Sequence, residues 1–161
     1  MLVQVAPICQ RGGLNAGTTT AATGTTNERP ECPHGWETYT GDGSNVKCFK
    51  YCGDQQYATH AEQYCQAQGG HLASIHSSEE QNFLMQTFGL TDDIWIGAVD
   101  TDHNGAWEWT DGSTFDFSNW VSGQPDGKQY YAYMGCNDSP SGQWKDYYYN
   151  VHQQYICQIT L

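Results

Sequence analysis

Seven cysteines in 161 residues constrain this chain more than any other feature of its sequence. This density is typical of small domains that fold in an oxidising compartment, where disulfides supplement a modest core. The sequence contains no CxxC pair and no Cys/His spacing typical of a zinc site, so disulfide bonds are favoured over metal binding. Because seven is odd, at least one thiol is free or bonds to another chain. We therefore expect a secreted, disulfide-stabilised protein.

The charge of the chain excludes several classes of partner. A net charge of −12 argues against nucleic acid and against an anionic membrane surface. No stretch is apolar for long enough to span a bilayer. Residues 1–8 are too short for a secretory signal and have no basic residue before them, so we expect a mature or trimmed form. From Gly53 onward, fourteen acidic residues are accompanied by only two cations, Lys128 and Lys145.

The first 30 residues differ in composition from the rest and are expected to lie outside the domain. Residues 1–9, MLVQVAPIC, indicate an apolar strand, and a Thr/Gly/Ala-rich linker that cannot build a core follows as far as residue 30. The threonines fit a plain spacer or a segment carrying O-linked sugar. The strand either folds back onto its own domain or pairs with the sheet edge of a neighbouring chain, which would give a homo-oligomer.

Residues 31–161 are expected to form one α+β domain, with six Trp and eleven Tyr in the whole chain to build its core. A helix is predicted over 59–68, with Thr59 and Glu62 as a capping box, and a second begins after Ser77, with Glu80 completing its box, and ends before Gly89. Strands are predicted over 36–39 and 46–51, which form a hairpin, and over 94–99, 106–110, 130–134, 142–144 and 154–159. Residues 71–75 are predicted as a short strand or an extended link. The expected architecture is two helices on antiparallel sheets with a long irregular loop region.

Six motifs follow one another in the domain: Cys32-Pro-His-Gly-Trp36, Ala61-Glu-Gln-Tyr-Cys65 with Gly69-Gly-His-Leu-Ala-Ser-Ile75, Trp95-Ile-Gly97, Gln124-Pro-Asp126, Trp144-Lys-Asp146 and Tyr155-Ile-Cys157. Together, in this order, they resemble the long form of the C-type lectin-like domain over residues 31–161. The resemblance implies that fold and the disulfides Cys32–Cys48 and Cys65–Cys157. Three cysteines, Cys9, Cys52 and Cys136, remain; two of them can pair, and the sequence does not reveal which.

The resemblance also implies a binding site. In sugar-binding members of the family, the two tripeptides surround one Ca²⁺ and hydrogen-bond two sugar hydroxyls. Transferred by position, the expected carbohydrate-binding residues are Gln124, Asp126, Gln129, Trp144, Lys145 and Asp146, with Gln124, Asp126 and Asp146 as calcium ligands. Pro125 would follow a cis peptide bond. In the family, the Gln-Pro-Asp order is associated with galactose-type rather than mannose-type sugars.

Lys145 departs from the family pattern, which has an asparagine between the Trp and the Asp. The lysine removes an oxygen ligand and adds a charge. At about 4 Å and an effective dielectric of about 20, two unit charges interact by roughly 4 kcal/mol, and a divalent ion would feel about twice that. Two arrangements stay open. Either the lysine turns outward and calcium binds, or its ammonium replaces the ion and bridges Asp126, Asp146 and Gln124.

A second acidic segment offers another candidate metal site. Asp100, Asp102, Asn104 and Gly105 match the first half of an EF-hand loop, with Asp111 at the twelfth position. The predicted flanking elements are strands rather than helices. An acidic hairpin with glycine at its turn therefore explains the pattern as well as a surface calcium site does.

Catalytic patterns are missing from the sequence. No Ser or Cys lies in a nucleophile-elbow pattern and no glycine-rich phosphate loop occurs, so no enzyme is expected. The expected function is a secreted carbohydrate-binding protein of the C-type lectin-like kind, galactose-type if calcium is bound. The alternative is a non-sugar-binding structural or protein-interaction module that self-associates through its N-terminal strand and an unpaired cysteine. The expected partner is accordingly a glycan or a protein ligand.

Overall fold

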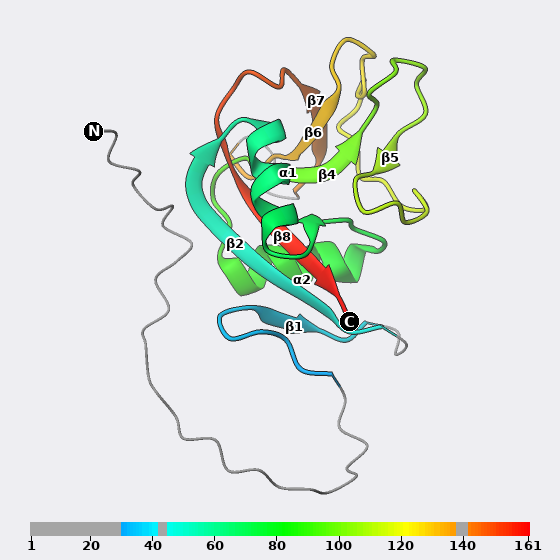
Figure 1. Ribbon diagram of the computed structural model, residues 1–161. Coiled ribbons are helices and arrows are strands. Elements are labelled where there is room, and N and C mark those ends of the chain that lie inside the picture. Colours follow the sequence, from blue (N-terminus) through cyan, green and yellow to red (C-terminus); the bar gives the residue numbers. More distant parts are fainter. Residues whose placement is uncertain (1–29, 42–44, 138–141) are drawn as a thin grey trace, which may run out of the picture.

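The computed structural model describes residues 30–41, 45–137 and 142–161. The predicted N-terminal strand, almost all of the linker and Cys9 lie outside these residues. The elements in chain order are β1 (Glu37–Tyr39), β2 (Lys47–Gln56), α1 (Ala58–Ala67), β3 (His71–Leu72), α2 (Ser78–Phe88), β4 (Ile94–Val99), β5 (Glu108–Trp109), β6 (Tyr131–Met134), β7 (Trp144–Tyr147) and β8 (Gln153–Thr160). The fold is therefore α+β, as expected (Figure 1).

The strands join in one sheet with the order β1-β2-β8-β4-β6-β7, while β3 pairs with β8 and β5 with β4. The pairings are antiparallel except that of β4 with β8, which is parallel. The sheet is thus mixed rather than purely antiparallel. The predicted hairpin is confirmed, because β1 pairs with β2 in the register Thr38 to Cys48.

The capping pattern predicts the start of one helix and fails for the other. Ser77 is the N-cap of α2 and accepts a hydrogen bond from the backbone N–H of Glu80 at 3.1 Å, and Gly89 ends the helix in the left-handed conformation. The capping box expected at Thr59 and Glu62 is wrong, since α1 begins after Tyr57, which makes no side-chain cap. The Glu62 carboxylate instead contacts β3, where it accepts a hydrogen bond from the backbone N–H of Leu72 at 2.9 Å.

Two strands near the candidate site differ from their predicted bounds. The strand predicted over 106–110 is only the two-residue β5, Glu108–Trp109. The strand predicted over 142–144 is instead β7, Trp144–Tyr147, because it continues along β6 in the register Ala132 to Asp146 and Tyr133 to Lys145. Both Lys145 and Asp146 are therefore held by a strand ladder rather than by a loop.

The helices cover two separate apolar clusters. Ala58, Ala61 and Cys65 of α1 pack with Trp95 and other buried residues of the sheet. Leu84 of α2 belongs to a second cluster that includes Trp109, Met134 and the fully buried Trp144. The indole N–H of Trp144 donates to the side-chain oxygen of Gln81 on α2 at 2.9 Å, which satisfies the one polar group of that ring.

Both predicted disulfides are present. Cys32 bonds to Cys48, and Cys65 bonds to Cys157 across 92 residues of sequence, which ties α1 to β8. Cys52 is also disulfide-bonded. Among the described cysteines, Cys136 is the free one, and it is partly buried.

Candidate functional site

The loop before β6 is fastened to β7 at the point where the sequence predicts a binding site. The peptide bond between Gln124 and Pro125 is cis, as expected. The side-chain oxygen of Gln124 accepts the backbone N–H of Asp146 at 3.2 Å. In return, Oδ1 of Asp146 accepts the backbone N–H of Asp126 at 3.1 Å. These reciprocal hydrogen bonds bring three predicted site residues together.

A polar cavity of about 460 Å³ opens at this junction. It is lined by Gln124, Asp126, Lys128, Gln129, Tyr133, Lys145, Asp146, Tyr147 and Tyr148. Five of the six predicted carbohydrate-binding residues line it. The exception is Trp144, whose side chain is 0% exposed and packs in the core, which corrects the expectation that it contacts a ligand.

Lys128 supplies an ammonium group to this cavity. Its Nζ donates to Oδ2 of Asp126 at 2.7 Å, and its backbone N–H donates to Oδ1 at 3.1 Å. The hydrogen bond from the Lys128 side chain is the main reason why the pKa of Asp126 is below its usual value, and the same contact raises the pKa of Lys128. Lys128 therefore supplies an amine to Asp126, a role that the sequence suggests for Lys145.

One carboxylate oxygen of Asp146 is unusual because it is buried without a hydrogen bond to any described residue. The residue is 4% exposed, and within the described part of the chain its Oδ2 is buried without a hydrogen-bond partner. Leaving a buried polar group unsatisfied costs about 1–3 kcal/mol, and more for a charged group. A cation or a donor from a ligand would remove that cost.

The oxygen donors of this cavity are of the kind that a hard cation takes, although the ammonium groups of Lys128 and Lys145 line it as well. Calcium takes six to eight oxygens from carboxylates, amide carbonyls and water. The cavity offers carboxylates of Asp126 and Asp146 and amides of Gln124 and Gln129. The described residues contain no group of three or more His, Cys, Asp or Glu suited to a metal. That absence is compatible with calcium here, because half of the candidate ligands are amides.

Two tyrosines at the cavity were missed by sequence reasoning. Tyr147 and Tyr148 line it and are 38% and 55% exposed, and Tyr149 beyond them is 52% exposed. The run of three tyrosines directly follows the Trp-Lys-Asp motif, and that adjacency is the signal that could have located them.

In the acidic segment 100–105, backbone N–H groups of the same segment satisfy the carboxylate of Asp100. Oδ1 and Oδ2 of Asp100 accept the backbone N–H groups of Asn104 at 3.1 Å and Gly105 at 3.0 Å. The Asn104 amide donates to Asp102 at 2.8 Å. These contacts are those of a hydrogen-bonded acidic turn. A calcium ion held by Asp100, Asp102 and Asn104 stays a prediction.

Known proteins resemble this chain in sequence. The family model described as the lectin C-type domain matches residues 54–159. Asialoglycoprotein receptor 1 of Rattus norvegicus is 33% identical over 147 residues, which are 88% of this chain and 49% of the receptor. The chain thus spans about half the length of that relative. The galactose-specific lectin nattectin of Thalassophryne nattereri is 33% identical over 154 residues, 92% of this chain and 89% of nattectin.

Solved structures agree with the sequence comparison. A calcium-independent type II antifreeze protein superposes with a TM-score of 0.74 at 29% identity, covering 84% of this chain and 100% of the other. The C-type lectin CEL-I from Cucumaria echinata superposes with a TM-score of 0.70 at 25% identity, covering 82% and 99%. Family model, relatives and fold together identify the chain as a member of the C-type lectin domain family, whose relatives found here are not enzymes.

Proposed function

We propose that this chain is a carbohydrate-binding lectin that holds its sugar, with the help of a calcium ion, in the cavity between the loop 124–129 and β7. The observation that carries the proposal is the buried Oδ2 of Asp146, which has no hydrogen-bond partner among the described residues. Asp146 also lines a cavity together with residues that carry further carboxylate and amide oxygens. A bound calcium ion would balance these oxygens and accept sugar hydroxyls as further ligands.

The protein groups around the cavity can hold a sugar in a fixed orientation. A sugar hydroxyl donates one hydrogen bond and accepts others, so it suits a site with both carboxylate acceptors and amide donors. Asp126, Asp146 and the amide of Gln124 supply these, and the reciprocal hydrogen bonds between loop and strand fix their positions. Lys128 is 71% exposed on its side chain, so it can leave Asp126 when a ligand binds.

The sugar class that we propose is galactose-type, and the compartment is extracellular. The support for galactose is the order Gln124-Pro125-Asp126 and the relative nattectin, which is named as galactose-specific. The support for secretion is the disulfide content, which is typical of oxidising compartments. Neither described helix is long and apolar enough to cross a bilayer.

Retention on immobilised galactose tests the proposal. The protein should be retained in calcium and released by a chelator, and free galactose should compete better than free mannose. Asp146→Asn should abolish retention, because it removes the charge of the unpartnered carboxylate. Asp92→Asn, the same change at an exposed turn, should leave retention intact. Retention of Asp146→Asn equal to that of the unmodified protein would overturn the proposal.

A protein-interaction module is the second candidate, and one observation favours it. Tyr147, Tyr148 and Tyr149 are exposed side by side in sequence, and exposed aromatics are frequent anchors of protein interfaces. Failure to bind any sugar, together with self-association that Tyr148→Ser reduces in sedimentation velocity, would support this candidate over the lectin.

A further inference from the structure

A larger cavity, of about 840 Å³, lies away from the galactose site. It is bordered by the end of β1, the start of β2, the start of α2 and the end of β8, through Tyr39, Lys47, Glu79 and Thr160 among others. Figure 1 places β1 and the C-terminus at the end of the domain remote from β6 and β7. Its volume lies within the range of about 300–1,000 Å³ typical of small-molecule sites.

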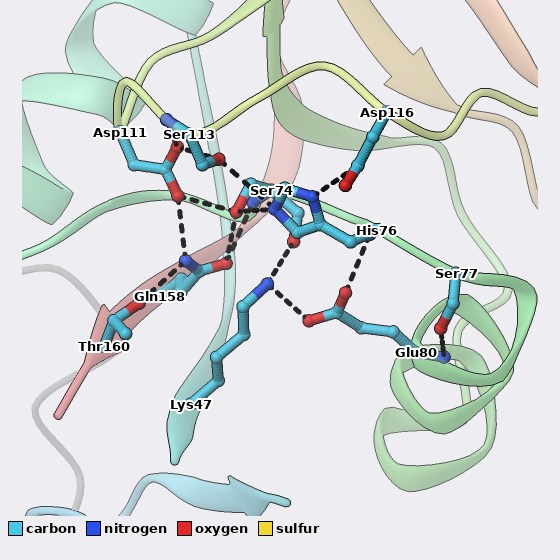
Figure 2. A network of polar contacts seen from close by, with 10 residues as sticks. All are labelled: Lys47, Ser74, His76, Ser77, Glu80, Asp111, Ser113, Asp116, Gln158 and Thr160. Carbon is cyan, nitrogen blue, oxygen red and sulfur yellow. Dashed lines mark hydrogen bonds and ion pairs between the residues drawn. The ribbon is translucent and has the colours of Figure 1, made fainter. Parts of the chain in front are cut away.

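A continuous polar network holds one wall of this cavity in place (Figure 2). Asp111 is at its centre: Oδ2 accepts the hydroxyl of Ser74 at 2.6 Å and the amide of Gln158 at 3.0 Å. The hydroxyl of Ser113 donates to Oδ1 of Asp111 at 2.5 Å. Burial alone would raise the pKa of Asp111, but these serine hydrogen bonds outweigh it, so the pKa is lowered.

A Ser–His–Asp arrangement within the network is positioned for structure rather than for catalysis. His76 contacts Asp116 through Nδ1 at 2.7 Å and the Ser113 hydroxyl through Nε2 at 3.2 Å. The Ser113 hydroxyl has one proton, and its shorter contact, at 2.5 Å, is with Asp111. Because that proton is directed to Asp111, Nε2 of His76 is not placed to remove it. The network therefore fixes a wall and activates no nucleophile.

Several groups bordering the cavity retain hydrogen-bonding capacity. Lys47 donates to Glu80 at 2.6 Å and to the carbonyl of Ser74 at 3.3 Å, which leaves one of its three N–H groups. The hydroxyl of Thr160 accepts from Gln158 at 3.3 Å and keeps its own proton. The carboxylate of Glu79 is an exposed acceptor. The border of the cavity thus offers both donors and acceptors.

The charges of the lining exclude other ligand classes. Lys47, the one lysine of the lining, is already paired with Glu80, and the further carboxylates of Glu79 and Asp111 would repel an anion. A metal ion would meet the Lys47 ammonium and find both oxygens of Asp111 occupied by hydroxyl protons. A neutral ligand with many hydroxyls avoids both costs, because each hydroxyl can donate and accept.

We propose that this cavity is a second ligand site, which binds a neutral oligosaccharide without a metal ion. The proposal does not depend on the galactose site, because the two cavities share no lining residue. A protein with two such sites would bind two sugar chains at once and cross-link them.

Nuclear magnetic resonance titration with maltotriose and with N,N′,N″-triacetylchitotriose tests the proposal, using the oxidised protein in chelator and, in parallel, the Asp146→Asn variant. With at least one of these neutral trisaccharides, saturable shifts are expected at the backbone amides of Ser77, Ser113 and Thr160 in both proteins. Thr160→Trp should fill the cavity and weaken binding by about tenfold or more. Thr38→Trp, the same change on an exposed position of β1 outside the lining, should not.

Three results would overturn the second site. One is the absence of saturable shifts at these amides with both trisaccharides while the chain remains folded, as judged by its dispersed amide spectrum. Another is binding that Thr160→Trp leaves unchanged. Shifts confined to residues around Asp146, which appear only in calcium, would assign the trisaccharide to the galactose site and would equally reject the proposal.

Discussion

Removing the charge of Glu80 should destabilise the fold, because Glu80 forms a buried ion pair with Lys47. Glu80 is 2% exposed, and its carboxylate accepts from Lys47 Nζ at 2.6 Å and from the backbone N–H of His76 at 2.7 Å. The Lys47 side chain is itself only 15% exposed. The pair thus joins β2 to the first turn of α2 inside the protein.

The expected magnitude follows from this burial. Removing one partner of a buried ion pair costs about 3–5 kcal/mol, because the other charge is left uncompensated. In Glu80→Gln, the Lys47 ammonium keeps the carbonyl of Ser74 at 3.3 Å and some contact with water. We therefore expect the lower end of the range, about 3 kcal/mol. Lys47→Met should cost a similar amount, and the double variant should cost less than the sum of the two by about 2 kcal/mol.

Urea unfolding of the oxidised protein, followed by tryptophan fluorescence, measures these free energies. Glu79→Gln is the matched control, because Glu79 is the exposed neighbour of Glu80 and its loss should leave the urea midpoint nearly unchanged. If Glu80→Gln unfolds at the same urea concentration as Glu79→Gln, or if the two partners behave additively, the pair does not stabilise the junction of β2 and α2.

Three further predictions concern the disulfide Cys65–Cys157, the free thiol of Cys136 and the loss of stability at low pH. Replacing Cys65 and Cys157 by serine should lower the free energy of unfolding by about 2–5 kcal/mol in the same urea assay, and an unchanged midpoint would count against a stabilising bridge. Cys136 should react slowly with iodoacetamide at about pH 8, because burial and then two nearby aspartates raise its pKa to about 11; alkylation at the rate of a free thiol would refute this. For Asp111, burial raises the pKa, but two serine hydrogen bonds outweigh burial, so the folded pKa is lowered. The ionised carboxylate therefore stabilises the protein above the unfolded pKa of Asp111, and this stability is lost as the pH falls through the folded pKa. Asp111→Asn should therefore lower stability at neutral pH and reduce its further loss below about pH 4, and parallel pH profiles for both proteins would contradict the assignment.

The parts of the structure that sequence could predict depend on local patterns or on a fixed order of motifs. The cap at Ser77 is local, because its donor, the N–H of Glu80, is three residues away. The disulfide between Cys65 and Cys157 came from the motif order rather than from spacing, which alone leaves the pairing open. The same order correctly grouped Gln124, Asp126 and Asp146, which the structure joins by hydrogen bonds.

The parts that sequence could not predict depend on contacts between distant segments. Thr59 and Glu62 have the spacing of a capping box, but Glu62 finds partners on β3 that sequence does not reveal. Trp144 was assigned to the ligand, yet its burial follows from β7 pairing with β6 beside the core. In the network around Asp111, the partners Ser74 and Gln158 are 37 and 47 positions away in the sequence, so no local sequence pattern predicts it.

Calorimetric titration of calcium into the oxidised protein, repeated with Asp146→Asn, tests the central claim most directly. The unpartnered carboxylate oxygen of Asp146 predicts that calcium binds the unmodified protein, that Asp146→Asn abolishes this binding, and that galactose makes it tighter, because two ligands of one site are reciprocally coupled. Absence of calcium binding, or binding that Asp146→Asn leaves unchanged, would contradict the account.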